Sequence, residues 1–311
     1  FILKPMKNLT RWQSKAVGKG FPPLIWSKKV AKLYAKPLYE NLDDDNESAT
    51  QSYDEFLEIG QRPPNEFGTG RFIVGDDNRR TIHLLYLKGS TVDNKLAEFI
   101  SAYFGLPVTT TVTELSMMAT GKSKTKKRSF ADISQDISFP LKYYKPGNST
   151  DVFSIFDVLV EFLPPGAFSS VLLVDFPISE DKEVVDGRAC GDRVAVVSSD
   201  SITTRRDHIL VVIHELLHTF GFDHCDAFAC IMNPASSETN TLELCPAELR
   251  KLLDAVRGID LVKRWRDLER LCRAEGWASD ADWFAQRLQL TDSVSNSSVA
   301  LPIPAATTRM T

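Results

Sequence analysis

The chain has 311 residues, of which 43% are hydrophobic and 25% charged, proportions typical of a soluble globular protein with a sizeable core. A formal net charge of −4 excludes a global cationic field that would draw the protein onto nucleic acid or anionic lipid. No run approaches the roughly 18 apolar residues that a membrane-spanning helix needs, so we expect no membrane partner. Because of the negative net charge, we do not expect a nucleic acid as partner either.

The expected location is intracellular. The N-terminal residues lack an apolar core followed by a small-residue cleavage site, so they predict no secretory signal. The five cysteines are odd in number, which argues against a disulfide scaffold and favours a reducing compartment. We therefore expect a cytoplasmic monomer, with the nucleus as the alternative location. Because Phe1 rather than Met opens the sequence, the presence of an upstream segment stays open.

Residues 1–70 are interpreted as an N-terminal extension docked on the rest of the protein. Their one clear element is an amphipathic helix at 52–59, in which Tyr53, Phe56 and Leu57 share a face. Three elements follow in chain order: a strand at 80–87, a helix at 94–103 with Asp93 as its N-cap, and a strand at 107–115. This is the order of a βαβ unit.

Residues 119–148 break this order and are predicted to be a loop insertion. They contain the basic run 122–128, which we interpret as solvated, with a nuclear localisation signal or a nucleic-acid contact as the alternative. An apolar helix at 151–162 is expected next, with Thr150 as its cap.

The second half of the chain begins with a nearly continuous apolar run at 170–176, typical of a strand that is buried on both faces. A strand at 193–198 follows, and then a helix at 208–220 with Asp207 as its N-cap. Three further helices are predicted at 246–256, 261–274 and 280–290, and residues 291–311 are predicted to be a disordered tail.

The helix at 208–220 carries the chemistry. His214 and His218 are four residues apart, so both imidazoles project from one helical face and can reach a single metal ion. Neutral imidazole suits zinc, and Glu215 is placed to accept a proton from water at the open position of the metal. Alone, this HExxH pattern also fits two surface histidines without a metal.

A third histidine makes the metal site much more specific. Gly221 can adopt the left-handed conformation that ends the helix and reverses the chain, which returns His224 to the metal as third ligand. Residues 214–224 then complete the HExxHxxGxxH pattern of the metzincins, zinc peptidases in which this pattern is followed by a Met-turn.

A narrower resemblance follows from the next residues. A cysteine directly after the third histidine, a second cysteine after four residues and a methionine two positions later resemble the archaemetzincin family, and they stand here as Cys225, Cys230 and Met232. That family then has a CxxC pair, of which only Cys245 matches, because Glu248 stands where the second cysteine should be. The resemblance is good from about residue 170 to 256.

The resemblance implies an α/β fold of metzincin type over residues 71–290. We expect a mixed twisted sheet with an active-site helix, an edge strand at 190–198 above the cleft, and a smaller C-terminal helical subdomain. The catalytic zinc would lie between the sheet part and the helical part, and Met232 would form the Met-turn beneath it.

The resemblance also implies a second, structural zinc on cysteines. Cys225, Cys230 and Cys245 carry over as ligands, and structural zinc is almost always four-coordinate. Glu248, three positions after Cys245 on a helix begun by Pro246, or the downstream Cys272, would supply the fourth ligand. The alternative is that the three cysteines are ordinary buried thiols.

The expected function is hydrolysis of peptide bonds in a peptide or protein substrate, with Glu215 as the general base toward water and the general acid toward the leaving amine. The alternative from another class is a zinc-binding regulatory or scaffold protein of the same fold with little hydrolytic activity. An amidohydrolase acting on non-peptide amides stays a third candidate. His83 and His208 are not expected to be ligands.

Overall fold

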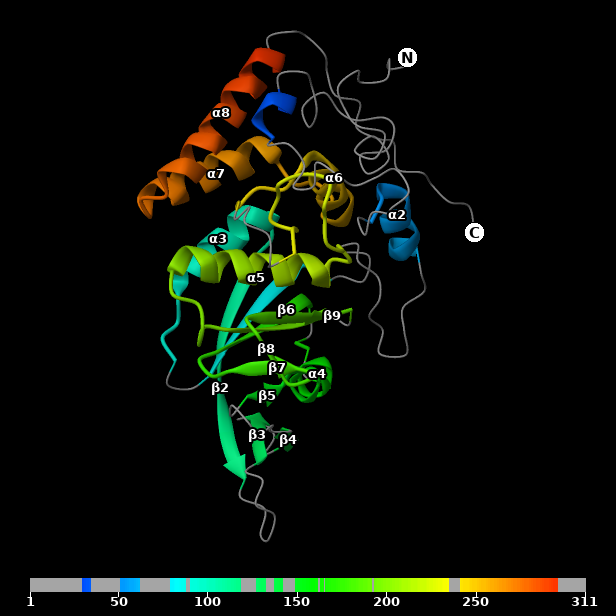
Figure 1. The fold of residues 1–311 in the computed structure, drawn as a ribbon, viewed down its shortest axis with the longest axis vertical. Coiled ribbons are helices and arrows are strands. Elements are labelled where there is room, and N and C mark those ends of the chain that lie inside the picture. The colour runs from blue at the N-terminus through cyan, green and yellow to red at the C-terminus, as the bar shows by residue number, and fades with distance from the viewer. Residues whose placement is uncertain are drawn as a thin grey trace.

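A mixed β-sheet crosses the middle of the protein (Figure 1). The computed structural model describes residues 30–34, 51–61, 79–87, 90–118, 127–132, 137–141, 149–161, 163–164, 166–191, 193–234 and 241–295. In these residues seven strands follow the order β4-β3-β2-β1-β6-β10-β9. Their bounds are β1 Thr81–Leu87, β2 Val108–Met118, β3 Lys127–Asp132, β4 Ile137–Leu141, β6 Ala167–Val174, β9 Gly187–Cys190 and β10 Val194–Ser198. The described fold is therefore mixed α/β.

The centre of the sheet is parallel: β1 pairs with β2 and with β6, and β6 pairs with β10. All eight residues of β6 are buried, which confirms the prediction of a strand covered on both faces. A smaller three-stranded sheet in the described residues has the order β5-β7-β8, with β5 Thr150–Asp151, β7 Ile178–Glu180 and β8 Glu183–Val185.

Helices cover both faces of the large sheet. They are η1 Val30–Leu33, α2 Tyr53–Gln61, α3 Asn94–Phe104, α4 Val152–Glu161, α5 Arg205–Thr219, α6 Pro246–Ala255, α7 Leu261–Ala274 and α8 Ala278–Ser295. Alternate residues of β10 show the two layers, since Ala195 and Val197 join the core with α3, α5 and the C-terminal helices, whereas Val194 and Val196 join the core with α4. Figure 1 shows α5 lying between the sheet and α6 to α8.

The predicted edge strand at 190–198 is two strands. β9 and β10 pair antiparallel, with Val194 opposite Cys190 and Val197 opposite Gly187, and Arg193 turns the chain with a φ of 65°. The outermost strand is therefore β9, while β10 is buried between β6 and β9. The sequence of residues 190–198 did not separate the edge strand from its inner neighbour, because this segment contains the end of β9 as well as the whole of β10.

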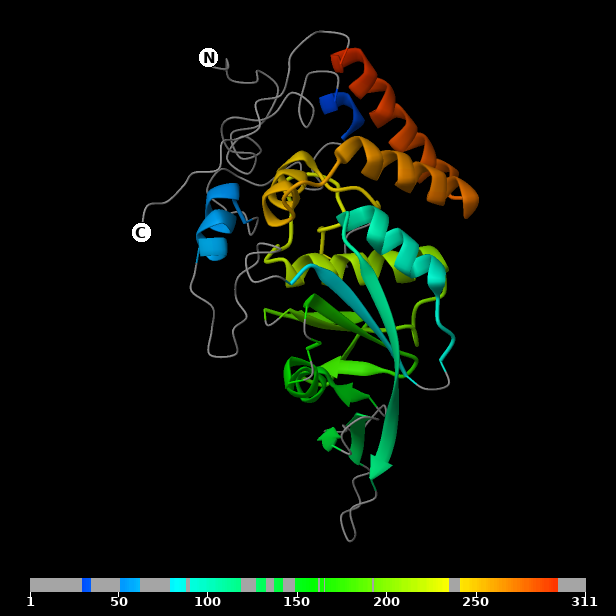
Figure 2. The same cartoon turned by 180° about the vertical axis from the view of Figure 1, so that it is seen from behind.

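The prediction of a loop at 119–148 is wrong for its described residues. Strands β3 and β4 form an antiparallel pair that continues from β2, and Figure 2 shows β2 extending to this pair beyond the other strands. These short polar segments lack the apolar periodicity that would predict a strand. Their extended conformation is stabilised by pairing with β2 instead. Most of the basic run, residues 122–126, lies outside the described residues.

Two predicted helix caps are also corrected. Thr204, not Asp207, begins α5, because its side chain accepts a hydrogen bond from Asp207 N at 3.0 Å. Asp151, not Thr150, accepts from Ser154 N at 3.3 Å at the start of α4. The cap of α3 by Asp93 is confirmed.

The C-terminal helix is longer than predicted. Helix α8 continues to Ser295, so residues 291–295 belong to it, and the rest of the predicted tail lies outside the described residues. Across the described chain, no helix combines the length and the apolar character that crossing a bilayer requires.

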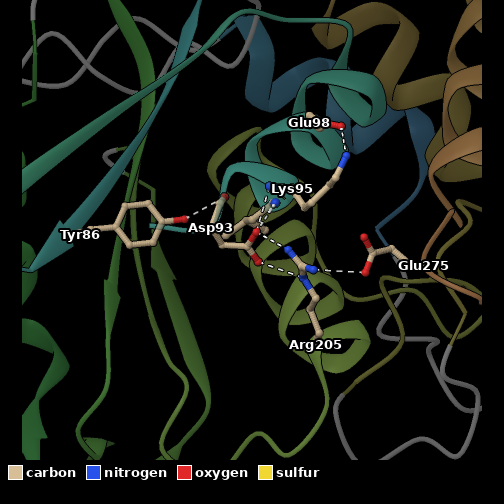
Figure 3. A network of polar contacts seen from close by, with 7 residues as sticks. Tyr86, Asp93, Lys95, Glu98, Arg205 and Glu275 are labelled. Carbon is tan, nitrogen blue, oxygen red and sulfur yellow. Dashed lines mark hydrogen bonds and ion pairs between the residues drawn. The ribbon is translucent and has the colours of Figure 1, made fainter. Parts of the chain in front are cut away.

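Helix α5 is tied to its neighbours by an arginine in its first turn. The Arg205 guanidinium bonds both carboxylate oxygens of Asp93, at the start of α3, and its Nη1 lies 3.2 Å from Glu275 Oε2 after α7 (Figure 3). Asp93 also accepts from the first-turn amides of α3. The starts of α3 and α5 and the end of α7 therefore meet at this arginine, which holds α5 in place against the sheet.

Candidate metal centre

Two histidines on α5 converge as their spacing predicts. His214 Nε2 and His218 Nε2 are 3.1 Å apart, one helical turn from each other. The helix ends directly after them: Gly221 has a φ of 84°, and its N–H donates to His218 O at 2.9 Å. This left-handed residue reverses the chain and confirms the predicted role of Gly221.

The reversal brings His224 to the other two histidines. Its Nε2 lies 3.3 Å from His214 Nε2, and the ligand atoms of the three side chains all lie within 4.8 Å of one another. Tetrahedral zinc with Zn–N bonds of about 2.0–2.1 Å places its nitrogen ligands roughly 3.3 Å apart. The three imidazoles therefore have the spacing that one zinc ion requires.

The protonation of the ring nitrogens favours a metal as well. His214 Nδ1 lies 2.7 Å from Ile231 O, and His218 Nδ1 lies 2.6 Å from Phe222 O, so each Nδ1–H donates to a carbonyl and each Nε2 keeps its lone pair. Burial lowers the pKa of His214 to about 4 and that of His218 to about 3. Burial also lowers the pKa of His224. All three are therefore neutral at pH 7, as metal ligands must be.

Glu215 lies beside this cluster with only 8% of its surface exposed. Burial raises the pKa of its carboxyl group to about 8, while the nearby Arg188 lowers it in part. No described residue donates a hydrogen bond to the carboxylate. A carboxyl group that receives no hydrogen bond from the described residues is available to exchange a proton with a small molecule beside it.

A cavity of about 480 Å³ opens next to these groups. One wall is formed by residues 188–191 of β9 and the turn that follows it. Glu215, His218 and the segment 221–224 also line the cavity. Ile59 of α2 is a further lining residue. We refer to this cavity as the cleft.

The contribution of α2 was not expected from the sequence, which assigned no function to residues 1–70. Gln51 Nε2 donates to Gly221 O at 3.0 Å and to Asp223 Oδ2 at 3.2 Å, so it holds the turn that carries the third histidine. The Phe56 ring packs edge-on against Phe222 with centroids 5.3 Å apart. No local motif could have identified Gln51, because its partners lie about 170 residues away in the chain.

The three predicted cysteine ligands also converge. Cys225, Cys230 and Cys245 are buried, their sulfur atoms lie within 4.8 Å of one another, and Cys225 Sγ is 3.8 Å from Cys245 Sγ. Zinc bound by thiolates at about 2.3 Å places the sulfurs roughly 3.8 Å apart. All five cysteines lie in the described residues and none is in a disulfide, and Cys272 is outside this cluster.

The loop between the two clusters is held by an asparagine that the sequence did not single out. Asn233 Oδ1 accepts from Cys230 N at 2.8 Å, and its Nδ2 donates to Phe228 O at 2.8 Å and to Cys225 O. Met232 is fully buried in the main core, and its carbonyl accepts from Cys225 N at 2.8 Å. The loop that orients His214 through Ile231 therefore also orients the cysteines.

Glu248 is buried near the cysteine cluster but lies outside the group of converging ligand atoms. Its Oε1 accepts from Lys251 Nζ at 2.9 Å, and its Oε2 has no partner among the described residues. Lys251 Nζ also donates to Gln51 O at 2.9 Å. Burial raises the pKa of Glu248 to about 8.

Comparison with known proteins gives a partial match. The chain matches no protein-family model. It is 43% identical over 61 residues to archaemetzincin-2 of Macaca fascicularis, a stretch of 18% of this chain that spans only 17% of that relative. A solved zinc-dependent peptidase from Methanocorpusculum labreanum superposes with a TM-score of 0.35 and 19% identity, covering 60% of this chain and 98% of the other. The partial sequence match confirms the resemblance to archaemetzincins.

Proposed function

We propose that this archaemetzincin-like chain is a zinc-dependent peptidase of metzincin type. The proposal rests mainly on the convergence of three neutral histidines: His218 Nε2 lies 3.1 Å and His224 Nε2 lies 3.3 Å from His214 Nε2. A buried carboxyl group, that of Glu215, lines the cleft beside them. This donor set would hold zinc, because three neutral imidazoles match the ligand type, the ligand number and the spacing of a catalytic zinc site. When bound, zinc supplies a Lewis acid that polarises the scissile carbonyl and acidifies water.

The protein groups perform the proton transfers. Glu215 accepts a proton from the attacking water and then donates it to the leaving amine, so it is the general base first and the general acid second. Glu215 lies directly after His214 and lines the cleft, so its carboxyl group is placed to reach both the water and the leaving amine. His214, His218 and His224 would hold the metal.

The proposed substrate is a peptide or a protein in an extended conformation. β9 is the last strand of the large sheet in the described residues, and residues 188–191 form a wall of the cleft. An extended peptide would pair with this edge by main-chain hydrogen bonds and lie across the cleft above Glu215. We assign α6 to α8 to the smaller helical subdomain that a metzincin fold would have.

We also propose a second zinc site, with a structural role, at Cys225, Cys230 and Cys245. Glu248 is the proposed fourth ligand, because its Oε2 is buried and has no partner among the described residues. Glu248 interacts electrostatically with Cys225, whereas Cys272 interacts with Asp280 and Arg206 instead, so Cys272 is not favoured. We also propose a reducing, intracellular location, because the three clustered cysteines must be reduced thiols to bind zinc.

The test combines elemental analysis with digestion of a peptide library by the wild-type protein and by Glu215→Gln, which keeps the shape of the side chain. We expect zinc in both proteins and cleavage only by the wild type, with a loss of about 10²–10⁴-fold in kcat for the variant. Equal cleavage by the two proteins would remove Glu215 from the mechanism. Zinc binding without any cleavage would instead favour a regulatory or scaffold protein.

A further inference from the structure

A glycine on β9 lies directly against the side chain of Glu215. The strand reads Gly-Arg-Ala-Cys, and alternate residues face opposite sides of the sheet. Gly187 is paired with Val197 and Ala189 with Ala195, and Val197 and Ala195 both belong to the core that contains α5. Gly187 and Ala189 therefore face α5, and both are small.

There is no room for a side chain at position 187. A Cβ atom placed there would lie 2.7 Å from Glu215 Cγ and 3.0 Å from Glu215 Oε1. It would also lie 3.0 Å from Val211 Cγ1, one turn earlier on the helix. Carbon atoms that are not bonded prefer separations of about 3.5–4.0 Å, so a methyl group would displace the Glu215 side chain.

Backbone freedom does not explain this glycine. The structure gives a left-handed φ to five described glycines, which include Gly105 and Gly221 but not Gly187. An alanine could therefore adopt the backbone conformation of residue 187 without strain. What the position requires is the close approach of β9 to α5.

The position of the Glu215 carboxylate depends on the packing of β9 against its side chain. No described residue donates a hydrogen bond to it, and 8% of the residue is exposed. A carboxyl group without hydrogen-bond donors is oriented by the atoms that pack against its methylene groups. Here those atoms include the bare backbone of Gly187.

We propose that Gly187 is a positioning residue for Glu215. Because residue 187 has no side chain, β9 can pack directly against the methylene groups of Glu215, and this packing holds the Glu215 carboxylate beside the histidine cluster. This inference rests on the proposed function for its catalytic meaning. It does not depend on the identity of the substrate, because the contact lies between two groups of the protein itself.

The kinetic test is Gly187→Ala. We expect kcat to fall by about 10–100-fold, because a displacement of about 1 Å can cost a factor near 10². KM and zinc content should stay near the wild-type values, because the three histidines do not move. An unchanged kcat in the zinc-loaded variant would overturn the proposal.

A double-mutant cycle on thermal stability gives a second readout that does not need activity. Gly187→Ala should lower Tm in the wild-type background and lower it much less in a Glu215→Ala background, where the obstructing side chain is absent. An equal loss of Tm in both backgrounds would mean that the added methyl group does not collide with Glu215, and it would refute the proposal. This comparison stays decisive if Gly187→Ala is strongly destabilised, since the double variant would then recover stability.

Crystal structures supply the matched control. Gly191→Ala adds a methyl group at a residue that follows β9 and lines the cleft, where no atom outside the neighbouring residues lies within 4 Å of it, so Glu215 should keep its wild-type position. In Gly187→Ala the carboxylate should move. If Glu215 moves and the Tm values couple while the wild type cleaves no peptide, the positioning holds and the proposed peptidase function is what has failed. An unmoved Glu215 in Gly187→Ala would refute the positioning role.

Discussion

His214 Nδ1 donates a hydrogen bond to the carbonyl oxygen of Ile231 at 2.7 Å, and this contact joins the helix of the first two histidines to the loop that follows the third. The same loop presents Cys225 and Cys230 to the cysteine cluster. The two candidate metal sites therefore share one supporting loop. We expect a substitution at either site to alter the metal affinity of the other.

His224→Ala tests the third ligand. Two protein ligands remain, whereas zinc sites normally have three or four, so the zinc affinity of this site should fall by several orders of magnitude. His208→Ala is the matched control, because His208 lies on the same helix but outside the cluster. Titration with a competing chelator measures both variants. Wild-type affinity in His224→Ala would mean that the site is not of metzincin type.

Gln51→Ala tests the support from the segment that leads into α2. The substitution removes the hydrogen bonds to Gly221 O and Asp223 Oδ2, and a typical intramolecular hydrogen bond contributes about 0.5–1.5 kcal/mol to stability. We expect a lower free energy of unfolding and weaker zinc binding, but a smaller loss than in His224→Ala. Glu58→Ala, at an exposed position of α2, should change neither quantity. If urea unfolding gives the same stability for Gln51→Ala and Glu58→Ala, the turn does not need α2.

The proposed fourth ligand of the second zinc is tested by exchange. Glu248→Cys should raise zinc affinity, because four thiolates hold zinc better than three thiolates and a carboxylate. Since Lys251 Nζ loses its carboxylate partner in that variant, the substitution is best combined with Lys251→Met, which removes the buried charge.

Cys230→Ser should have the opposite effect and remove one zinc per chain, while Cys272→Ser, outside the cluster, should retain it. Elemental analysis and Tm with and without zinc measure these outcomes, since binding to the folded state alone raises Tm. If zinc stoichiometry is the same in all these variants, the three cysteines are ordinary buried thiols.

His83 predicts a pH dependence that is separate from the metal. Burial lowers its pKa in the folded protein, whereas an unfolded chain has a histidine pKa of about 6.5. Below about pH 6.5 the unfolded state binds more protons, so the contribution of His83 to stability is present above that pH and is lost as the pH falls toward the lowered folded value. In chelated, metal-free protein, His83→Gln should therefore lose less stability than wild type between about pH 7 and 5. Urea unfolding at several pH values measures this, and parallel curves would exclude His83 as the source.

The sequence by itself determined the parts of the site that depend on local geometry. His214 and His218 converge because a helix repeats every 3.6 residues, and Gly221 returns His224 because glycine tolerates a positive φ. The strand at 170–176 and the helix at 94–103 were likewise predicted, because apolar periodicity and the Asp93 cap act over a few residues.

Only the tertiary structure decided which distant segments complete the site. Gln51 contacts the turn at Gly221, Gly187 contacts Glu215, and β9 rather than β10 forms the edge of the sheet. The strands β3 and β4 owe their conformation to pairing with β2. Such contacts join residues far apart in the chain, and no local spacing records them, because close packing selects partners by shape after the elements have formed.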